Sequence, residues 1–324
     1  MNQNFVDFMR GYMDAPLAVA VSGGVDSVTL LCWLVRLGAH VTALHVNHDL
    51  RPTAGVEAAY VTRLCASLGV PCHVFHWAGP KPHSGLEAAA RTARYRFMTD
   101  WCRANGVRYL LTAHQADDQI ETFLLNLARG SGISGLAAMR GVSYRDGITI
   151  LRPLLSVPRT ELVAYCDNNG IKYYHDEMND DMRYARVRMR KNRHVLQDAL
   201  GISDARISLA VRNLGRIRDA LECDVASLVS RTLCDNRAVF TDSFLFDLTP
   251  DIRLKFIAAL IMQIGGGEYQ PRLKSLEGAL NTLTHDCKFT LGHCTIRRLG
   301  ERILIVPEGT RTSFRKRHEK TKKE

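Results

Sequence analysis

A short run of small and acidic residues near the N-terminus has the composition of a phosphate-binding loop. Its members are Ser22, Gly23, Gly24, Val25, Asp26 and Ser27. Residues 17–21 before it form an apolar run typical of a buried strand, and residues 28–37 after it carry apolar side chains at helical spacing. A glycine turn between a strand and a helix binds anions, because free N–H groups and the helix dipole point at one place. We therefore expect these six residues to hold a phosphate group.

The spacing of this loop excludes two common nucleotide-binding motifs. A Walker A loop requires a lysine, which is absent here. The dinucleotide fingerprint requires a third glycine, and Ser27 stands at that position. The pattern Ser-Gly-Gly-x-Asp-Ser resembles the PP-loop of the ATP pyrophosphatase superfamily. That resemblance implies that the chain binds ATP, cuts it between the α- and β-phosphates and transfers AMP to a substrate oxygen.

A second cluster consists of three acids, Asp117, Asp118 and Glu121, that follow a predicted strand at 108–113. They share one face of a predicted helix over 116–127, where the helix dipole favours negative charge. Such carboxylates suit two tasks, holding Mg²⁺ against ATP phosphates and accepting a proton from an amine. A simple helix cap is the alternative.

A third group lies on a predicted helix over 86–104. Glu87 and Arg91 have the spacing of a surface ion pair, which is the plainer explanation for both. If Arg94 faces the strand ends, its guanidinium would lie near the phosphates, to which it is well suited.

The elements that must position these groups alternate between strands and helices. We predict strands over residues 17–21, 40–48, 71–77, 108–113 and 148–151, with a last short strand over 171–174. We predict helices over residues 28–37, 56–68, 86–104, 116–127 and 158–169. This alternation indicates an α/β fold with a doubly wound, mostly parallel sheet. Ligands of such sheets bind beyond the carboxyl ends of the strands, so motifs at strand ends are the strongest candidates for function.

Four regions follow from the pattern along the chain. Residues 1–180 form the catalytic α/β domain, and 181–232 form a basic helical linker without strands. Residues 233–310 form a smaller α+β region, with a helix near 252–263 and strands at 289–291 and 303–306. The tail 311–324 has too few apolar residues to fold and is predicted to be disordered.

Composition and cysteine usage are those of a cytoplasmic protein. The chain has 324 residues, 46% of them hydrophobic, without an apolar run long enough to span a membrane or a signal-peptide pattern. Its nine cysteines include no Cys-x-x-Cys pair, which argues against zinc and iron–sulfur sites and favours a reducing compartment. No stable protein partner is evident.

The charge is uneven and predicts a polyanionic partner. Of a formal net charge of +10, residues 311–324 hold +5 and residues 180–193 hold +4. Two basic stretches on a near-neutral body are typical of nucleic-acid binding. A solubilising tail and a solvated helix face are the alternatives.

Taken together, the motifs resemble the bacterial tRNA(Ile)-lysidine synthetase family over roughly residues 15–195. The matching segments are Ser22–Ser27, His45-Val46-Asn47-His48-x-Leu50-Arg51, Glu87-x-x-x-Arg91-x-x-Arg94-Tyr95, His114-x-x-Asp117-Asp118-Gln119-x-Glu121-Thr122, Arg129-Gly130-Ser131-Gly132-x-x-Gly135-Leu136, Arg152-Pro153-Leu154-Leu155, Asp176-x-x-Asn179 and Tyr184-x-Arg186 with Arg190. The chain departs from the family pattern at Glu177-Met178 and at Val187. The fold implied is the PP-loop, adenine-nucleotide alpha-hydrolase-like one.

The resemblance implies an ATP-dependent ligase that joins free L-lysine to C2 of the wobble cytidine of tRNA(Ile) with a CAU anticodon. The reaction runs through an adenylated tRNA, yields AMP and pyrophosphate, and changes the codon read from AUG to AUA. ATP, Mg²⁺, lysine and the tRNA are the implied ligands, and residues 233–310 would bind tRNA.

Roles for single residues follow from the same resemblance. Asp26 and Asp117 would hold Mg²⁺, and Asp118 would accept the proton of the lysine amine or hold its ammonium group. The residues implied to stabilise phosphate charge or hold RNA are Arg91, Arg94 and Arg186. The residues implied to bind tRNA are Arg186, Arg188, Arg190 and Lys191.

Two other functions remain open at this point. A tRNA thiolase with the same loop would replace oxygen by sulfur, but its relatives generally use paired cysteines. A nucleotide-sensing RNA-binding protein without catalysis would leave the loop and the three acids unexplained.

Overall fold

The structure is a computed structural model that describes residues 1–49, 54–79, 81–82, 85–174, 185–267 and 270–309. It divides into two compact units, Met1–Gly215 and Arg216–Glu324. The boundary falls within a long helix, α9 (Asp204–Thr232).

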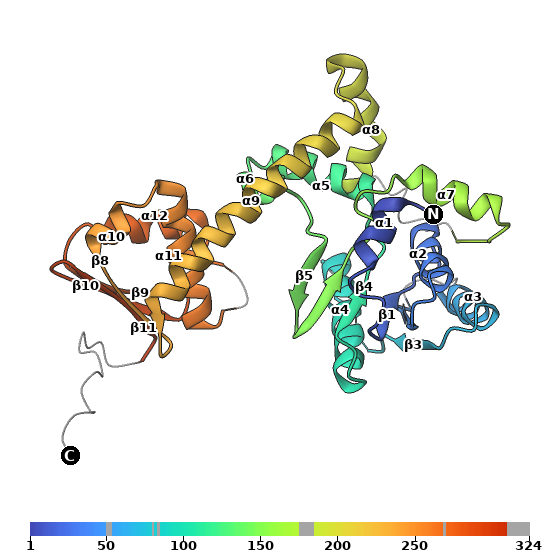
Figure 1. The fold of residues 1–324 in the computed structure, drawn as a ribbon, viewed down its shortest axis with the longest axis horizontal. Coiled ribbons are helices and arrows are strands. Elements are labelled where there is room, and N and C mark those ends of the chain that lie inside the picture. The colour runs from blue at the N-terminus through green and yellow to red at the C-terminus, as the bar shows by residue number, and fades with distance from the viewer. Residues whose placement is uncertain (50–53, 80, 83–84, 175–184, 268–269, 310–324) are drawn as a thin grey trace. The chain divides into compact units, whose positions relative to one another are not determined.

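The first unit alternates strands and helices along the chain (Figure 1). Its strands are β1 (Leu17–Ala20), β2 (Val41–Asn47), β3 (Cys72–His76), β4 (Tyr109–Leu111), β5 (Val142–Arg145) and β6 (Ile148–Leu151). Its helices before α9 are α1 (Gln3–Met9), α2 (Val25–Arg36), α3 (Ala54–Ser67), α4 (Leu86–Ala104), α5 (Ala116–Ala128), α6 (Ile133–Leu136), α7 (Arg159–Asn168) and α8 (Ala185–Leu200).

A six-stranded sheet in the order β3-β2-β1-β4-β6-β5 forms the centre of this unit. Strand β1 is parallel to both of its neighbours, β2 and β4. In this register Leu17 lies opposite Val41 of β2 and Tyr109 of β4. Chain order reverses at β1, so the carboxyl ends of β1 and β4 flank a topological switch point. The predicted doubly wound, mostly parallel sheet is confirmed.

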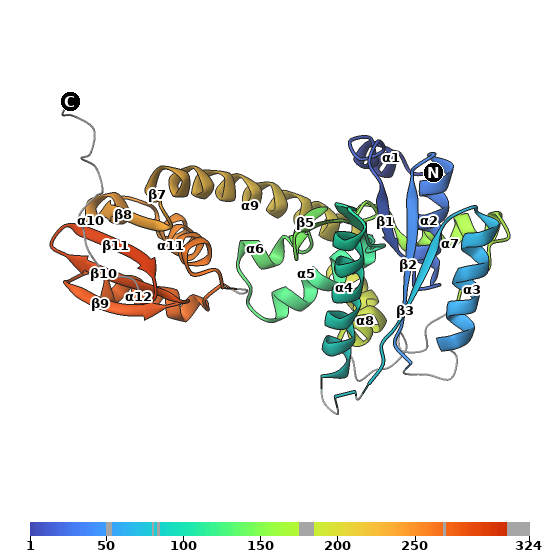
Figure 2. The same ribbon diagram turned by 90° about the horizontal axis from the view of Figure 1, so that it is seen from below.

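Helices cover both faces of the sheet because its central strands are apolar on both sides. Leu17 and Val19 of β1 point into a core shared with α1, α2, α3 and α7. Ala18, between them, points into the opposite core with Tyr95 and Met98 of α4. Figure 2 shows α3 and α4 on opposite sides of β2 and β3.

The edge strand β5 is absent from the prediction. It pairs antiparallel with β6 through a tight turn at Asp146 and Gly147, whose φ angles are 51° and 78°. An Asp-Gly pair between two apolar runs is a hairpin signal, so this strand could have been found from the sequence.

The predicted strand over 171–174 is wrong. Ile171 and Tyr173 pack instead against apolar side chains of α2 and α7. The backbone of Tyr174 donates one hydrogen bond, at 2.9 Å, to the carbonyl of Gly23 and joins no sheet. An apolar run shows that a segment is buried, but it does not show which neighbour buries it.

The predicted basic helical region is present as α8 and α9. Within the first unit their apolar side chains pack on α5, where Ile120 and Leu124 meet Ile207 and Val211. Met189 and Leu196 of α8 pack on the same cluster, which holds α8 against the helix that carries the three acids.

The second unit confirms a smaller α+β region with an antiparallel sheet in the order β7-β8-β11-β10-β9. Its strands are β7 (Leu233–Cys234), β8 (Arg237–Thr241), β9 (Cys287–Leu291), β10 (Cys294–Leu299) and β11 (Arg302–Pro307). Its helices after α9 are α10 (Asp242–Phe246), α11 (Pro250–Gly265) and α12 (Leu273–Thr282). Ile257 and Ile261 of α11 pack on Ile296 and Ile305 of the sheet.

The predicted domain boundaries after residues 180, 232 and 310 stay predictions. The tail 311–324 lies outside the described residues. Among the helices described, none combines the length and the apolar character needed to cross a membrane.

Candidate active site

A cavity of about 490 Å³ opens beyond the carboxyl ends of β1, β2 and β4. Ten of the residues predicted for the site line it: Ser22, Gly24, Val25, Asp26, Ser27, Arg91, Arg94, Asp118, Arg186 and Arg190. Four others, although the structure describes them, do not line it: Gly23, Asp117, Arg188 and Lys191. The fold thus brings four separate segments of the sequence to one cavity: the loop at 22–27, α4, α5 and α8.

The loop after β1 has the hydrogen bonds of a rigid turn. The buried Ser27 hydroxyl accepts a hydrogen bond from the Ser22 N–H at 3.1 Å and donates one to the Gly24 carbonyl at 3.0 Å. Gly23 has a φ of 94°, a backbone conformation that residues other than glycine rarely adopt. Gly24 is the N-cap of α2 and supplies no side-chain cap, so the first N–H groups of the helix can receive an anion.

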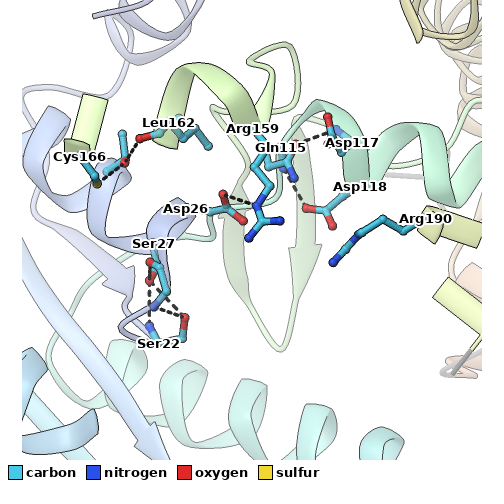
Figure 3. Close-up of polar contacts among 12 residues, drawn as sticks. Ser22, Asp26, Ser27, Gln115, Asp117, Asp118, Arg159, Leu162, Cys166 and Arg190 are labelled. Carbon is cyan, nitrogen blue, oxygen red and sulfur yellow. Dashed lines mark hydrogen bonds and ion pairs between the residues drawn. The ribbon is translucent and has the colours of Figure 1, made fainter. Parts of the chain in front are cut away.

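Asp26, in the first turn of α2, is a perturbed carboxyl. Burial raises its pKa to about 6 against the opposing charge of Arg159, and the carboxylates of Asp118 and Asp117 add to the rise. Arg159 Nε lies 3.8 Å from Asp26 Oδ1, which is an ion pair without a hydrogen bond. Figure 3 shows the Arg159 guanidinium beside Asp26, on the side that faces Asp118.

Asp118 caps a helix and also lines the cavity. Its Oδ2 accepts the Gln115 N–H at 3.0 Å, while Gln115 Oε1 accepts the Asp117 N–H at 2.6 Å, which makes a capping box at the start of α5. Burial raises the pKa of Asp118, and this effect outweighs the opposing hydrogen bond from Gln115. The cap alternative is therefore correct for Asp118, but the same carboxylate also faces the cavity.

The three acids of α5 do not share one environment. Glu121 is fully buried, and Arg190 Nε donates to its Oε1 at 2.7 Å. Asp117 instead pairs with Arg193 of α8 at 3.6 Å. The predicted shared face therefore divides, with Asp118 and Glu121 in the cavity and Asp117 in the contact between α5 and α8.

Arg91 and Arg94 form a cationic wall on α4. Their guanidinium carbons lie 5.2 Å and 5.8 Å from the centre of the Tyr95 ring. Burial lowers the pKa of Arg94 despite the nearby Tyr95, and the Arg91 charge adds to this effect. The side chain of Glu87, predicted to pair with Arg91, lies outside the described ones. The wall favours anionic ligands.

His114 lies at the end of β4 and lines the same cavity. Burial and the neighbouring charge of Arg152 lower its pKa well below the usual value, so the imidazole is neutral at pH 7. Its Nδ1 lies 3.0 Å from the Thr112 hydroxyl.

The basic residues of α8 that were predicted to bind tRNA fall into two groups. Arg186 and Arg190 line the cavity together with the buried Val187. Arg188 and Lys191 are solvent-exposed. The predicted set therefore comprises two residues at the site and two on the surface beside it.

Among the cavity residues that sequence reasoning missed are Arg159 and Tyr174. Arg159 directly follows Pro158 at the start of α7. The start of a helix is a position at which anions bind, and this signal could have singled out Arg159. No comparable signal marks Tyr174, whose place depends on its hydrogen bond to Gly23.

Comparison with known proteins agrees with these motifs. The PP-loop domain model matches residues 1–197. The chain is 37% identical over 317 residues to the tRNA(Ile)-lysidine synthase of Ruegeria pomeroyi, which covers 94% of this chain and 75% of that protein. It is 36% identical over 318 residues to the enzyme of the same name from Rhodopseudomonas palustris, which covers 90% of each.

A solved structure adds support for the fold alone. A U34-tRNA thiolase from Methanococcus maripaludis superposes with a TM-score of 0.54 over 66% of this chain and 77% of that one, at 16% identity. The sequence matches carry the assignment further: this chain belongs to the tRNA(Ile)-lysidine synthase family, with a PP-loop domain at its N-terminus.

Proposed function

We propose that this chain ligates free L-lysine to C2 of the wobble cytidine of tRNA(Ile) with a CAU anticodon and converts ATP to AMP and pyrophosphate. The observation that carries the proposal is one cavity that joins the loop at 22–27, the carboxylates of Asp118 and Glu121, and the Arg91–Arg94 wall. Membership of the family supports the same reaction. The product lysidine changes the codon read from AUG to AUA.

In the first step the C2 oxygen of cytidine attacks the α-phosphorus of ATP. The bond to the bridging oxygen breaks, and pyrophosphate leaves. The loop amides and the N-terminus of α2 hold phosphate charge, and Arg91 and Arg94 neutralise it as it shifts. The oxygen at C2 becomes part of a good leaving group.

In the second step the ε-amine of lysine attacks C2, and AMP leaves with the former C2 oxygen. The amine has a pKa of about 10.4 and must first lose a proton. Asp118 is the proposed base, because burial raises its pKa and makes it a better proton acceptor than an ordinary aspartate. The hydrogen bond from Gln115 holds this carboxylate in place.

Mg²⁺ is implied by the family's chemistry, and Asp26 fits the role of a ligand. Its Oδ1 is buried without a hydrogen bond from any described group. The described residues contain no cluster of three metal-binding side chains, and Mg²⁺ commonly uses one or two carboxylates with substrate phosphates. When bound, the ion would neutralise phosphate charge. Asp117 could serve as a second ligand only by leaving its ion pair with Arg193.

RNA contacts are proposed for the basic side of α8 and for the second unit. Arg186 and Arg190 would hold the anticodon region at the cavity, and the exposed Arg188 and Lys191 would contact backbone phosphates. Residues 233–310 are the proposed tRNA-binding region of the second unit.

The proposed location of the protein is the cytoplasm. All nine cysteines are free thiols, which agrees with this location.

The test is lysine incorporation by the purified chain. With labelled lysine, ATP and a tRNA(Ile) transcript bearing CAU, one lysine should enter per pyrophosphate released, and a C34U transcript should accept none. A thiolase would incorporate sulfur and no lysine, and a nucleotide sensor would bind both ligands without releasing pyrophosphate. Either result would overturn the proposal. Of the described residues that line the cavity none is a cysteine, which supports the ligase over the thiolase.

A further inference from the structure

Arg159 is a cation of the ATP cavity with one buried donor that meets no acceptor among the described residues. Its side chain lines the cavity and is 33% exposed. Its Nε is buried, yet makes no hydrogen bond with any described residue. A guanidinium offers five donors, and buried donors without an acceptor are rare in native proteins. An anionic ligand would supply the missing acceptors.

The position of Arg159 places it at the phosphate loop. Among the described residues its ion-pair partner is Asp26, at 3.8 Å, which is too far for a hydrogen bond. Because Asp26 is the second residue of α2, a guanidinium that reaches it also reaches a phosphate held by the first N–H groups of that helix. Arg91 and Arg94 belong instead to the wall built around Tyr95 on α4.

We propose that Arg159 binds the β- and γ-phosphates of ATP and stabilises the pyrophosphate that leaves in the first step. The inference rests on the proposed function. As the bond between the C2 oxygen and the α-phosphorus forms, the bond from that phosphorus to the bridging oxygen breaks, and its electron pair passes to pyrophosphate. A planar guanidinium pairs bidentately with phosphate oxygens and so suits the growing charge. The lysine step involves no pyrophosphate, so Arg159 has no part in it.

Binding of inorganic pyrophosphate tests the contact directly. By calorimetry, Arg159→Gln should weaken pyrophosphate binding about tenfold to hundredfold, which is the loss expected for a charge-assisted hydrogen bond. Arg159→Lys should lose less, because it keeps the charge. AMP, which lacks the leaving phosphates, should bind with unchanged affinity. The matched control is Arg103→Gln, since Arg103 pairs with Asp100 on the surface of α4 and does not line the cavity.

A second comparison separates direct contact from an effect through Asp26. In an Asp26→Asn background the partner charge is gone, and Arg159→Gln should still weaken pyrophosphate binding by a similar factor. If Arg159→Gln causes no further loss of pyrophosphate affinity in that background, the proposal is overturned. Arg159 would then be a positioning residue for Asp26. An equal loss of AMP affinity would also overturn it, because the contact would then not be with the leaving group.

Single-turnover kinetics completes the test. Arg159→Gln should slow formation of adenylated tRNA and leave the reaction of preformed adenylated tRNA with lysine unchanged. If both steps slow equally, Arg159 does not act on the leaving group. A wild-type chain that binds pyrophosphate but transfers no AMP would refute the proposed function instead, so the two failures are distinguishable.

Discussion

Asp118→Asn is expected to separate the two chemical steps. Asparagine has the same shape, and its side-chain oxygen can accept the Gln115 N–H bond that Asp118 accepts at 3.0 Å. The capping box at the start of α5 should therefore survive. The ability to take a proton at neutral pH is lost.

The retained cap and the lost proton acceptor set the expected changes in stability and in rate. Loss of a whole cap costs about 0.5–2 kcal/mol, so a variant that keeps the cap should lose less than about 1 kcal/mol of unfolding free energy. A positioned general base contributes about 10²–10⁴-fold to a rate, and the lysine step should slow by that factor. Adenylation should keep its rate, because it needs no proton from an amine.

The assay runs the steps separately. Chain, tRNA and ATP are mixed without lysine, adenylated tRNA is measured, and lysine is then added in a rapid-quench apparatus. Raising the pH should partly restore the lysine step, because more of the amine is then deprotonated. Asp100→Asn is the control, since Asp100 pairs with Arg103 on the surface of α4.

Two results would refute this reasoning. Loss of adenylation together with the lysine step would place Asp118 with the ATP phosphates. Near-normal rates for both steps would make it a helix cap alone.

Four further predictions test the loop and the tail. Asp26→Ala should abolish adenylation without unfolding the chain, as pyrophosphate release and circular dichroism can check; surviving adenylation would contradict the loop assignment. Without ATP, Asp26→Asn should melt higher than wild type above pH 6, and the difference should vanish toward pH 4, because burial raises the folded pKa to about 6 from 3.8 and so makes the ionised form destabilising. Gly23→Ala should cost about 1–3 kcal/mol in urea unfolding and weaken ATP binding, because φ is 94° there; an unchanged stability would contradict the strain. Deleting residues 311–324 should weaken binding of all tRNAs alike and reduce the salt slope by about 0.7–0.9 for each lost phosphate contact, with the preference for tRNA(Ile) kept; an unchanged slope would make the tail a solvated appendage.

The strand and helix pattern of the first unit was predictable because each element carries its own signal. The apolar run at 17–21, the glycine turn after it and the helical spacing beyond need only neighbours in sequence. The second unit was harder, since β10 alternates less clearly: Arg297 and Arg298 interrupt its apolar side chains. Its place between β9 and β11 depends on pairing partners, which short-range patterns do not specify.

For the site, the sequence alone determined the chemistry of the loop and named the acids and arginines that gather at the cavity. Tertiary structure decided which of them meet. Asp117 and Asp118 are adjacent in the chain, yet Arg193 draws one toward α8 while the capping box holds the other at the cavity. Arg159 meets Asp26 although 132 intervening residues separate them in the chain. Local chemistry depends on neighbours in sequence, whereas these partnerships depend on how α7 and α8 pack against the sheet and its helices, and that packing is a property of the whole fold.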